Sequence, residues 1–374
     1  MPVICVTGPR QSGKTTLVKH LFPGFAYYNL EFPEHRQYAI SDARSFLKGA
    51  TSGIIIDEIQ RVPELLSHIQ YLVDEEKPQG KIILTGSQNI LLMQSVSQTL
   101  AGRVALFTLL PFSVFELQGT PFGGKEMESY LVNSLYPRIY DQELHSGPWL
   151  QDYINTYIER DVRQITAVKD LSVFTSFLKL CAGHCGQLVN FTTFSNNLGV
   201  DVKTIRAWLS ILETSYIIFL QPPWFRNVNK RVIKSPRLFF YDCGLACNLL
   251  GIKDETGYST HYLKGGLFES FIISEILKYI YNHKLNSNVY FFRDSNGNEM
   301  DAILELPGKI KAIEIKSGRT ITNDFFKGFQ VWNKFSGEEI PENYLVYAGE
   351  DYQSRSVATV LGWKHLYRIF DVKN

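Results

Sequence analysis

The first residues that could carry out chemistry form a glycine-rich segment near the start of the chain. Gly8-Pro9-Arg10-Gln11-Ser12-Gly13-Lys14-Thr15 fits the pattern G-x-x-x-x-G-K-[ST], and Thr16 completes the predicted contact set. In such a loop the backbone N–H groups surround phosphates, the lysine reaches the β- and γ-phosphates, and the threonine hydroxyl can bind Mg²⁺. An apolar run at 3–7 precedes the segment and a helical pattern at 15–21 follows it, as such a loop requires. The sequence therefore predicts a nucleotide site whose ligands are ATP and Mg²⁺.

Acidic and polar residues end two further apolar runs. Asp57 and Glu58 follow Ile54-Ile55-Ile56; there Asp57 can hold Mg²⁺, and Glu58 can orient or deprotonate an attacking water. Leu84-Thr85-Gly86-Ser87 ends the next run, where Ser87 either contacts the γ-phosphate or belongs to an ordinary strand end. Downstream of a phosphate-binding loop, these strand ends predict ATP hydrolysis, with Glu58 as a catalytic residue and Thr15 and Asp57 as metal ligands.

A second set of charged residues lies in the last third of the chain. Asp301 with Glu314-Ile315-Lys316 fits the pattern D-x(n)-[DE]-x-K, in which two carboxylates share a divalent metal and the lysine acts on the attacking water. A two-residue turn at Pro307-Gly308 would place Asp301 opposite Glu314, with Cβ atoms about 4.5–5.5 Å apart. The spacing predicts a metal site with Lys316 as a catalytic residue. A hairpin with solvated charges, or the same fold without catalysis, would show the same residues.

Buried strands and helices are expected to position these residues. Apolar runs at 3–7, 53–58 and 81–87 alternate with a helical stretch from 63 to 74, which predicts a parallel sheet covered by helices. Residues 130–180 are mostly helical in pattern. The last third is of α+β type, with a helix near 266–281 and strands at 289–293, 300–306, 310–316 and 344–348. The predicted fold class is α/β, with a P-loop sheet first and a second α/β domain last.

Residues 191–213 have the pattern of two helices around a glycine turn. Leu198 and Gly199 mark the turn, and Asp201 is a good N-cap for the second helix. This helix has an apolar stripe of Val202, Ile205, Leu209 and Leu212, and its other faces carry Lys203, Thr204, Arg206 and Ser210. Strand-like runs at 216–220 and 237–241 bracket a basic loop with Trp224, Phe225, Arg226, Lys230, Arg231 and Lys234. The pattern predicts a winged helix, which either contacts DNA or serves as a lid or protein dock.

Composition and charge exclude several classes of protein. Of the 374 residues, 45% are hydrophobic and 20% are charged, which supports two or three domains with sizeable cores and excludes collagen-like and low-complexity chains. Lys and Arg number 38 against 37 Asp and Glu, so a uniformly basic nucleic-acid binder is excluded. Cys181/Cys185 and Cys243/Cys247 have C-x-x-x-C spacing, for which buried, reduced thiols are a better interpretation than a metal site. No signal peptide or membrane-spanning run is evident, so we expect a cytoplasmic protein.

The ordered set of motifs resembles a prokaryotic family of AAA-type P-loop ATPases. Besides the loop, I-I-I-D-E-I-Q and L-T-G-S, the chain carries Leu100-Ala101-Gly102-Arg103-Val104, Leu110-Pro111-Phe112-Ser113-Val114-Phe115-Glu116-Leu117, Ile158-Glu159-Arg160-Asp161-Val162 and Phe239-Phe240-Tyr241-Asp242-Cys243-Gly244-Leu245-Ala246. Members have a C-terminal restriction-endonuclease-like, or PD-(D/E)xK, domain of poorly understood function. They also carry a segment before the first strand that helps to hold adenine, whereas this sequence begins two residues before that strand.

The resemblance implies further site residues. Glu269 is similar to the helix glutamate that PD-(D/E)xK nucleases place near their metal, and it would join Asp301 and Glu314 as a metal ligand. ATPases of this type also use an arginine to stabilise transition-state charge, often one from a neighbouring subunit. Arg103 and Arg160 are the candidates for that role, and an ordinary salt bridge is the alternative for each.

The predicted organisation has four parts. They are an AAA-type P-loop ATPase domain at 1–118, a helical lid or linker at 119–180, a winged-helix-like domain at 181–250 and a PD-(D/E)xK nuclease-like domain at 251–374. The predicted function is Mg²⁺-dependent ATP hydrolysis, in a homo-oligomer, that controls a DNA-directed, nuclease-like C-terminal domain. The alternative is a nucleotide-dependent switch whose C-terminal domain binds DNA or a protein partner without cleavage. The intact set of Asp301, Glu314 and Lys316 favours the first, and the near-neutral net charge favours the second.

Overall fold

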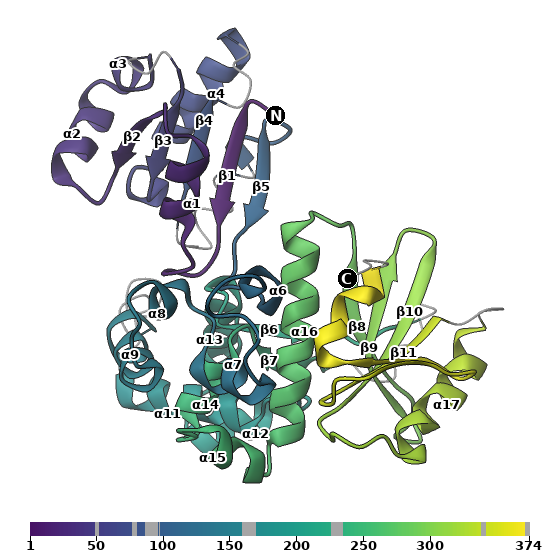
Figure 1. Ribbon diagram of the computed structural model, residues 1–374. Helices are drawn as coiled ribbons and strands as arrows, with labels where there is room; N and C mark the ends of the chain where they lie inside the picture. Colours follow the sequence, from purple (N-terminus) through teal and green to yellow (C-terminus); the bar gives the residue numbers. More distant parts are fainter. Residues whose placement is uncertain are drawn as a thin grey trace. The chain divides into compact units, whose positions relative to one another are not determined.

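A computed structural model describes residues 1–48, 52–76, 81–86, 96, 98–158, 170–225, 235–337 and 342–370 (Figure 1). The chain divides into two units. The first contains Met1–Pro111 together with Tyr136–Asp141 and Thr214–Tyr216. The second contains Phe112–Leu135, Gln142–Glu213 and Ile217–Asn374. Most of the predicted linker, winged-helix-like and C-terminal parts thus fall in one unit, and their division into separate domains stays a prediction.

The first unit is built on a five-stranded sheet with the order β2-β3-β4-β1-β5, in which every neighbouring pair is parallel. Its strands are β1 (Val3–Thr7), β2 (Ala26–Asn29), β3 (Ile54–Asp57), β4 (Ile82–Thr85) and β5 (Val104–Thr108). Its helices include α1 (Lys14–Leu21), α2 (Pro33–Ser41), α3 (Ala43–Lys48), α4 (Leu65–Glu76) and the short turn η1 (Ile59–Arg61). The parallel sheet predicted from the three apolar runs is confirmed.

Both faces of this sheet are buried, which explains why its strands are continuously apolar. On one face, Val3, Ile56 and Leu84 pack in a cluster with side chains of α3 and α4 such as Phe46 and Ile69. On the other face, the intervening strand residues pack against α1; this cluster contains Val6, Val18, Ile55 and Ile83. The alternation follows from the two-residue period of a strand, whose successive side chains point to opposite faces.

Two short segments from the middle of the sequence belong to the first unit. In α8 (Pro137–Asp141), Pro137 lies near the loop, since a Cβ atom added to Gly13 would be 3.8 Å from its Cγ. The Tyr216 hydroxyl lies 3.4 Å from that of Thr7 and 3.1 Å from that of Thr108, the last residues of β1 and β5. The strand predicted from residue 216 was placed too early, because Tyr216 has a φ of 55°, which strands do not use.

The second unit begins with a largely helical part. Its elements include α6 (Val114–Leu117), α7 (Met127–Asn133), α9 (Ser146–Tyr153), η2 (Ile154–Ile158), α11 (Leu171–Gly183), α12 (Phe191–Leu198), α13 (Val202–Thr214), α14 (Cys243–Leu249) and α15 (Glu255–Thr260). The helix pair predicted at 191–213 is confirmed: Gly199 ends α12 at a φ of 66°, and the Asp201 carboxylate accepts the Thr204 N–H at 2.8 Å. Strands β6 (Ile218–Gln221) and β7 (Arg237–Phe240) follow as an antiparallel pair. The winged-helix assignment itself stays a prediction.

The C-terminal part is a mixed six-stranded sheet with the order β12-β13-β11-β10-β9-β8. Its elements are α16 (Lys264–Asn282), β8 (Asn288–Arg293), β9 (Glu299–Leu306), β10 (Lys309–Lys316), η3 (Asn323–Phe326), α17 (Lys327–Ser336), β11 (Glu342–Tyr347), β12 (Tyr352–Ser354), β13 (Thr359–Gly362) and η4 (Trp363–Phe370). The predicted turn at 307–308 is confirmed, and the hairpin register runs from Lys309 opposite Leu306 to Ile313 opposite Ala302. Among the described helices, none has the length and apolar content needed to cross a membrane.

Helix α16 carries a buried ion pair that holds the start of the second unit. Lys278 Nζ lies 2.8 Å from Glu275 Oε1 and donates to the carbonyl oxygen of Phe112 at 2.9 Å. The other carboxylate oxygen of Glu275 accepts the N–H of Val114 at 2.8 Å and the hydroxyl of Tyr367 at 2.5 Å. Because both charges are almost fully buried, these hydrogen bonds are needed to offset the loss of hydration.

The loop glycine Gly8 provides a test of the fold of the first unit. Gly8 has a φ of 139°, and an added Cβ atom would lie 2.0 Å from the carbonyl oxygen of Leu109. We expect Gly8→Ala to lower the free energy of unfolding by about 3 kcal/mol or more, because strain and a backbone clash combine. Gly102, with a φ of 73° and no atom within 4 Å of an added Cβ, is the matched control. Gly102→Ala should lower the free energy of unfolding by only about 1 kcal/mol. If urea titrations gave the two variants the same loss of stability, the predicted clash at Gly8 would be contradicted.

Candidate functional sites

The glycine-rich loop connects the carboxyl end of β1 to the first turn of α1. Gly13 caps the helix with a φ of 90°, and Gln11 also has a positive φ of 61°, so the loop curls sharply before Lys14. The Lys14 ammonium group is buried and donates to the carbonyl oxygens of Gly8 at 3.1 Å and Pro9 at 2.6 Å. Burial lowers the pKa of Lys14 from 10.5 to about 8, although the carboxylates of Glu58 and Asp57 oppose the shift. The lysine is therefore held inside the loop as a weakly solvated cation.

The carboxylate of Asp57 is buried at the end of β3 and accepts hydroxyl groups from three elements. Thr15, in α1, donates to Oδ2 at 2.9 Å, and Tyr27, in β2, donates to the same oxygen at 2.8 Å. Thr85, the last residue of β4, donates to Oδ1. The structure thus brings together the two predicted metal ligands Thr15 and Asp57, which are 42 residues apart in sequence.

The remaining predicted nucleotide contacts surround this centre. Glu58 follows Asp57 with a φ of 58°, and its carboxylate accepts the side-chain amide of Gln60. Arg10 is half-buried in the loop, whereas Gln11 and Thr16 are exposed. Ser87 lies outside the described residues, and Thr85, from the same strand end, supplies the contact to Asp57.

The loop region fits a nucleotide with Mg²⁺. The Ser12 hydroxyl is buried and has no hydrogen-bond partner among the described residues, so a polar ligand would satisfy it. Helix α1 begins at the loop and offers free N–H groups at its positive end, which attract phosphate. The hydroxyl oxygen of Thr15 and the carboxylate of Asp57 are hard ligands of the kind that Mg²⁺ prefers.

The structure places Arg103 far from the loop of its own chain. Its carbonyl oxygen accepts the N–H of Val3, so it lies at the amino ends of β1 and β5, whereas the loop follows the carboxyl end of β1. The length of β1, about 13 Å at 3.3 Å per residue, separates the two ends. The Arg103 guanidinium pairs with Asp74 at 2.6 and 2.9 Å. Arg160, the other candidate, lies outside the described residues.

The predicted C-terminal residues form one charged cluster, in which Asp301 and Glu314 are buried and Glu269 and Lys316 are partly exposed. Lys316 Nζ lies 2.6 Å from Glu314 Oε1 and 3.5 Å from Asp301 Oδ2. Asp301 Oδ2 also accepts the N–H of Ile315 at 2.8 Å. Glu269, from α16, joins the cluster through Arg237, the first residue of β7. The three predicted metal ligands therefore share one site, but their contacts are with cations of the chain itself.

Arg237 and its partner Glu299 are cluster residues that the sequence did not single out. The guanidinium of Arg237 lies 3.4 Å from Glu269, 3.7 Å from Asp301 and 3.2 Å from Glu299. It is 8% exposed, so it is a buried cation whose charge the three carboxylates offset. An arginine in the otherwise apolar strand 237–240 was the available signal, because a buried cation requires acidic partners.

Burial controls the protonation of this cluster. Loss of hydration, followed by repulsion from Asp301, raises the pKa of Glu269 and that of Glu314 from 4.5 to about 8 each. Burial alone would lower the pKa of Lys316. The negative charges of Asp301 and Glu314 outweigh this effect and raise the pKa of Lys316 above its ordinary value. Burial therefore favours the neutral forms of Glu269 and Glu314, whereas the neighbouring cations Arg237 and Lys316 favour their charged forms.

As it stands, the cluster is only a partial fit for a metal ion. In its favour, one oxygen of Glu269 and one of Glu314 are buried without a hydrogen-bond partner in the described part of the chain. Against it, no group of three or more His, Cys, Asp or Glu side chains in the described ranges is arranged to hold a metal. The guanidinium of Arg237 lies against two of the predicted ligands, Glu269 and Asp301, so a metal would have to displace it.

The predicted DNA-contacting residues are described only in part. On α13, Lys203, Arg206 and Ser210 are exposed, and the Arg206 guanidinium lies 4.0 Å from the centre of the Phe191 ring. Ile205, Leu209 and Leu212 are buried, as the apolar stripe predicts. The basic loop residues Arg226, Lys230, Arg231 and Lys234 lie outside the described residues.

The cysteines are buried, free thiols. Cys5, Cys181, Cys185, Cys243 and Cys247 form no disulfide. Burial raises the pKa of each thiol, to about 12 for Cys185. These thiols are therefore protonated at neutral pH, in line with the interpretation as reduced core residues.

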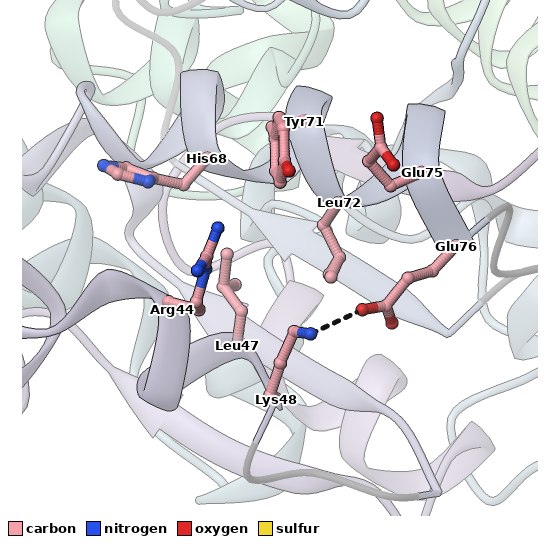
Figure 2. A pocket seen from close by; sticks show the side chains of 8 residues that line it. All are labelled: Arg44, Leu47, Lys48, His68, Tyr71, Leu72, Glu75 and Glu76. Atoms are coloured by element: carbon pink, nitrogen blue, oxygen red, sulfur yellow. Dashed lines mark ion pairs between the residues drawn. The ribbon is translucent and has the colours of Figure 1, made fainter.

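Figure 2 shows a pocket of about 190 Å³ in the first unit, between α3 and α4. Its wall carries both signs of charge, with Lys48 and Glu76 paired at 2.8 Å and the Arg44 guanidinium 5.8 Å from the Tyr71 ring centre. Its other lining residues are Leu47, His68, Leu72 and Glu75. None of the predicted nucleotide-contacting residues lines it, so it is separate from the loop site.

Three segments of the chain match protein families. Residues 1–118 match a family described as an AAA domain. Residues 124–256 and 264–366 match two domains of unknown function, DUF8612 and DUF4143. The N-terminal part of the chain is therefore an AAA-type P-loop domain, and the matches to the other two parts state no activity.

Two relatives are 29% identical to this chain over 321 residues, which is 85% of this chain and 71% of each relative. They are the uncharacterized proteins Mb2031c of Mycobacterium bovis and Rv2008c of Mycobacterium tuberculosis. The solved structure of protein VC1899 from Vibrio cholerae aligns over 97% of this chain and 95% of its own at 12% identity. Its TM-score of 0.21 is no evidence of a shared overall fold.

The lowered pKa of Lys14 predicts how nucleotide binding depends on pH. Only the protonated lysine attracts phosphate, and in the free protein it loses its proton above about pH 8. The negative charge of bound phosphate raises the pKa of Lys14, so the bound lysine keeps its proton where the free one has lost it. Binding above pH 8 therefore requires uptake of a proton, and ATP affinity should fall about tenfold per pH unit. Calorimetric titration in EDTA between pH 7 and 9.5 measures the effect without a metal. Lys14→Arg, which stays charged, should show no such slope; a constant wild-type affinity would contradict the prediction.

Proposed function

We propose that the protein binds ATP and hydrolyses it with Mg²⁺ at the loop of the first unit. The observation that carries this proposal is the 2.9 Å hydrogen bond between Thr15 and Asp57, formed beside the buried ammonium group of Lys14. Phosphate-binding loops followed by an acidic strand end use these three groups for nucleotide and metal. The match of residues 1–118 to an AAA domain supports the same activity.

Each group of the chain has a separate task in this proposal. Lys14 leaves the carbonyl oxygens of Gly8 and Pro9 and binds the β- and γ-phosphates. Thr15 and Asp57 hold Mg²⁺, which neutralises phosphate charge and orients the γ-phosphate when it is bound. Glu58 accepts the proton of the attacking water or orients it, because it stands directly after Asp57 at the same strand end.

The arginine that stabilises the developing charge comes from another subunit in this proposal. Arg103 lies at the opposite end of β1 from its own loop, so it can act only on the site of a neighbouring copy. Its pairing with Asp74 must then give way to the phosphate. Arg160 is the second candidate, and a homo-oligomer is a requirement of this mechanism.

A substitution at Lys14 tests the binding of ATP, and a substitution at Glu58 tests its hydrolysis. Lys14→Ala removes a charged phosphate contact and should weaken ATP binding roughly 10- to 100-fold. Glu58→Gln should keep nucleotide binding and lower kcat by a factor on the order of 100 or more, since only the action on water is lost. Lys48→Ala and Glu64→Gln, at exposed positions of the same unit, are the matched controls. Unchanged ATP binding in Lys14→Ala would refute the assignment of the loop.

For the second unit, we propose a nuclease-like, DNA-directed site at Asp301, Glu314 and Lys316 that the ATPase controls. The gathering of these residues in one cluster with Glu269 supports the proposal. A second candidate function is a nucleotide-dependent switch that binds DNA or a protein without cleaving it. One observation favours this second candidate: Arg237 already supplies the positive charge that a metal would bring to Glu269 and Asp301.

Metal binding distinguishes the two functions of the second unit. Under the nuclease proposal, Mn²⁺ should give heat in a calorimetric titration without nucleotide, and Asp301→Asn should abolish that heat. Lys316→Ala should retain the heat and lose cleavage of plasmid DNA, because the lysine acts on water. Asp324→Asn, at an exposed carboxylate, is the control. Absence of heat and of cleavage in the wild type would leave the binding function, with Arg237 as the resident cation.

A further inference from the structure

Tyr27 contacts the same oxygen of Asp57 as the predicted magnesium ligand Thr15. Its hydroxyl donates to Asp57 Oδ2 at 2.8 Å, and that of Thr15 donates to Oδ2 at 2.9 Å. The phosphate-binding motif predicts the threonine contact but contains no tyrosine. Tyr27 therefore needs its own explanation.

The sheet fixes Tyr27 in this place. β2 pairs with β3 so that Tyr27 lies beside Ile55, which makes Asp57 its diagonal neighbour on the same face. Diagonal positions are about 7–8 Å apart, a distance that a long aromatic side chain can span. The Lys19 ammonium group lies 3.5 Å from the centre of the Tyr27 ring and packs against it from α1. The ring is thus held by a strand and a helix, and its hydroxyl ends at the carboxylate.

We propose that Tyr27 is a positioning residue for magnesium, which holds the carboxylate of Asp57 in the orientation that the nucleotide-bound metal requires. This inference rests on the proposed ATPase function. Thr15 has to reorient its hydroxyl when its oxygen binds Mg²⁺, whereas Tyr27 on Oδ2 and Thr85 on Oδ1 keep both ends of the carboxylate fixed. Such partners of a ligand commonly change metal affinity by roughly 10- to 100-fold when they are removed.

The strand itself provides a matched control. Tyr28 is the next residue of β2, and it points to the other face of the sheet, where its ring lies 4.6 Å from that of Phe46. Tyr27→Phe and Tyr28→Phe remove the same atom from neighbouring residues of one strand. Only the first removes a hydrogen bond to Asp57.

The experiment titrates Mg²⁺ into protein that is partly saturated with a fluorescent ATP analogue. In EDTA, Tyr27→Phe should bind the analogue as the wild type does, because Lys14 and the loop N–H groups are intact. This measurement also shows that the site is folded. The Mg²⁺ concentration for half-maximal enhancement of binding should rise roughly tenfold, and in Tyr28→Phe it should stay at the wild-type value. Loss of kcat in Tyr27→Phe should be recovered at high Mg²⁺, which a general structural defect would not allow.

The outcomes separate this inference from the function on which it rests. A Mg²⁺ titration of Tyr27→Phe that overlays the wild type would overturn the role of Tyr27 while the ATPase proposal stands. An equal shift in Tyr28→Phe would also overturn it, because the effect would then belong to the strand. If the Lys14→Ala variant bound the analogue as tightly as the wild type does, both the role of Tyr27 and the ATPase proposal would be overturned.

Discussion

The structure of the first unit depends on the burial of one carboxylate. Asp57 is 4% exposed at the carboxyl end of β3, and a buried charge without partners would cost several kcal/mol. Its partners come from β2, α1 and β4, so the hydrogen bonds that satisfy Asp57 also tie together the helix and the strands beside β3. A parallel sheet places these strand ends at one edge, and this is why a metal site can form there from residues far apart in sequence.

The second unit satisfies its buried charges in a different way. Among the described residues, the side chains that hydrogen-bond to the Asp57 carboxylate are neutral hydroxyls, and Lys14 adds a nearby positive charge. Around Asp301 the partners include Arg237 and Lys316, which already compensate the carboxylates. A cation entering that cluster has to displace a guanidinium, and burial, which raises the pKa of Glu269 and of Glu314, opposes the charged forms that it would bind. A metal at the first site would therefore meet a carboxylate held by neutral hydroxyls, whereas the proposed metal at the second would first have to displace a cation of the chain.

The sequence predicted those features that follow from local pattern. The apolar runs identified β1, β3 and β4, and the turn at 307–308 predicted the register of the C-terminal hairpin, because strand period and turn length are local. The contacts of Tyr27 and Arg237 were missed because they depend on which strands are neighbours. Tyr216 was assigned to a strand because aromatic residues favour strands, whereas it has a positive φ and its hydroxyl contacts Thr7 and Thr108. Motif spacing thus identified candidate site residues, and long-range pairing determined which side chains contact them.

The chain passes between the two units at several points, and the first of them follows Leu109. Leu109 is held against the loop, since its carbonyl oxygen occupies the space beside Gly8. Phe112 and Val114 are held by the buried Lys278 and Glu275 of α16, the helix that also carries Glu269. Only Leu110 and Pro111 lie between these anchors, and proline has a fixed φ. At this point the chain therefore passes from the first unit to the second without a long flexible linker.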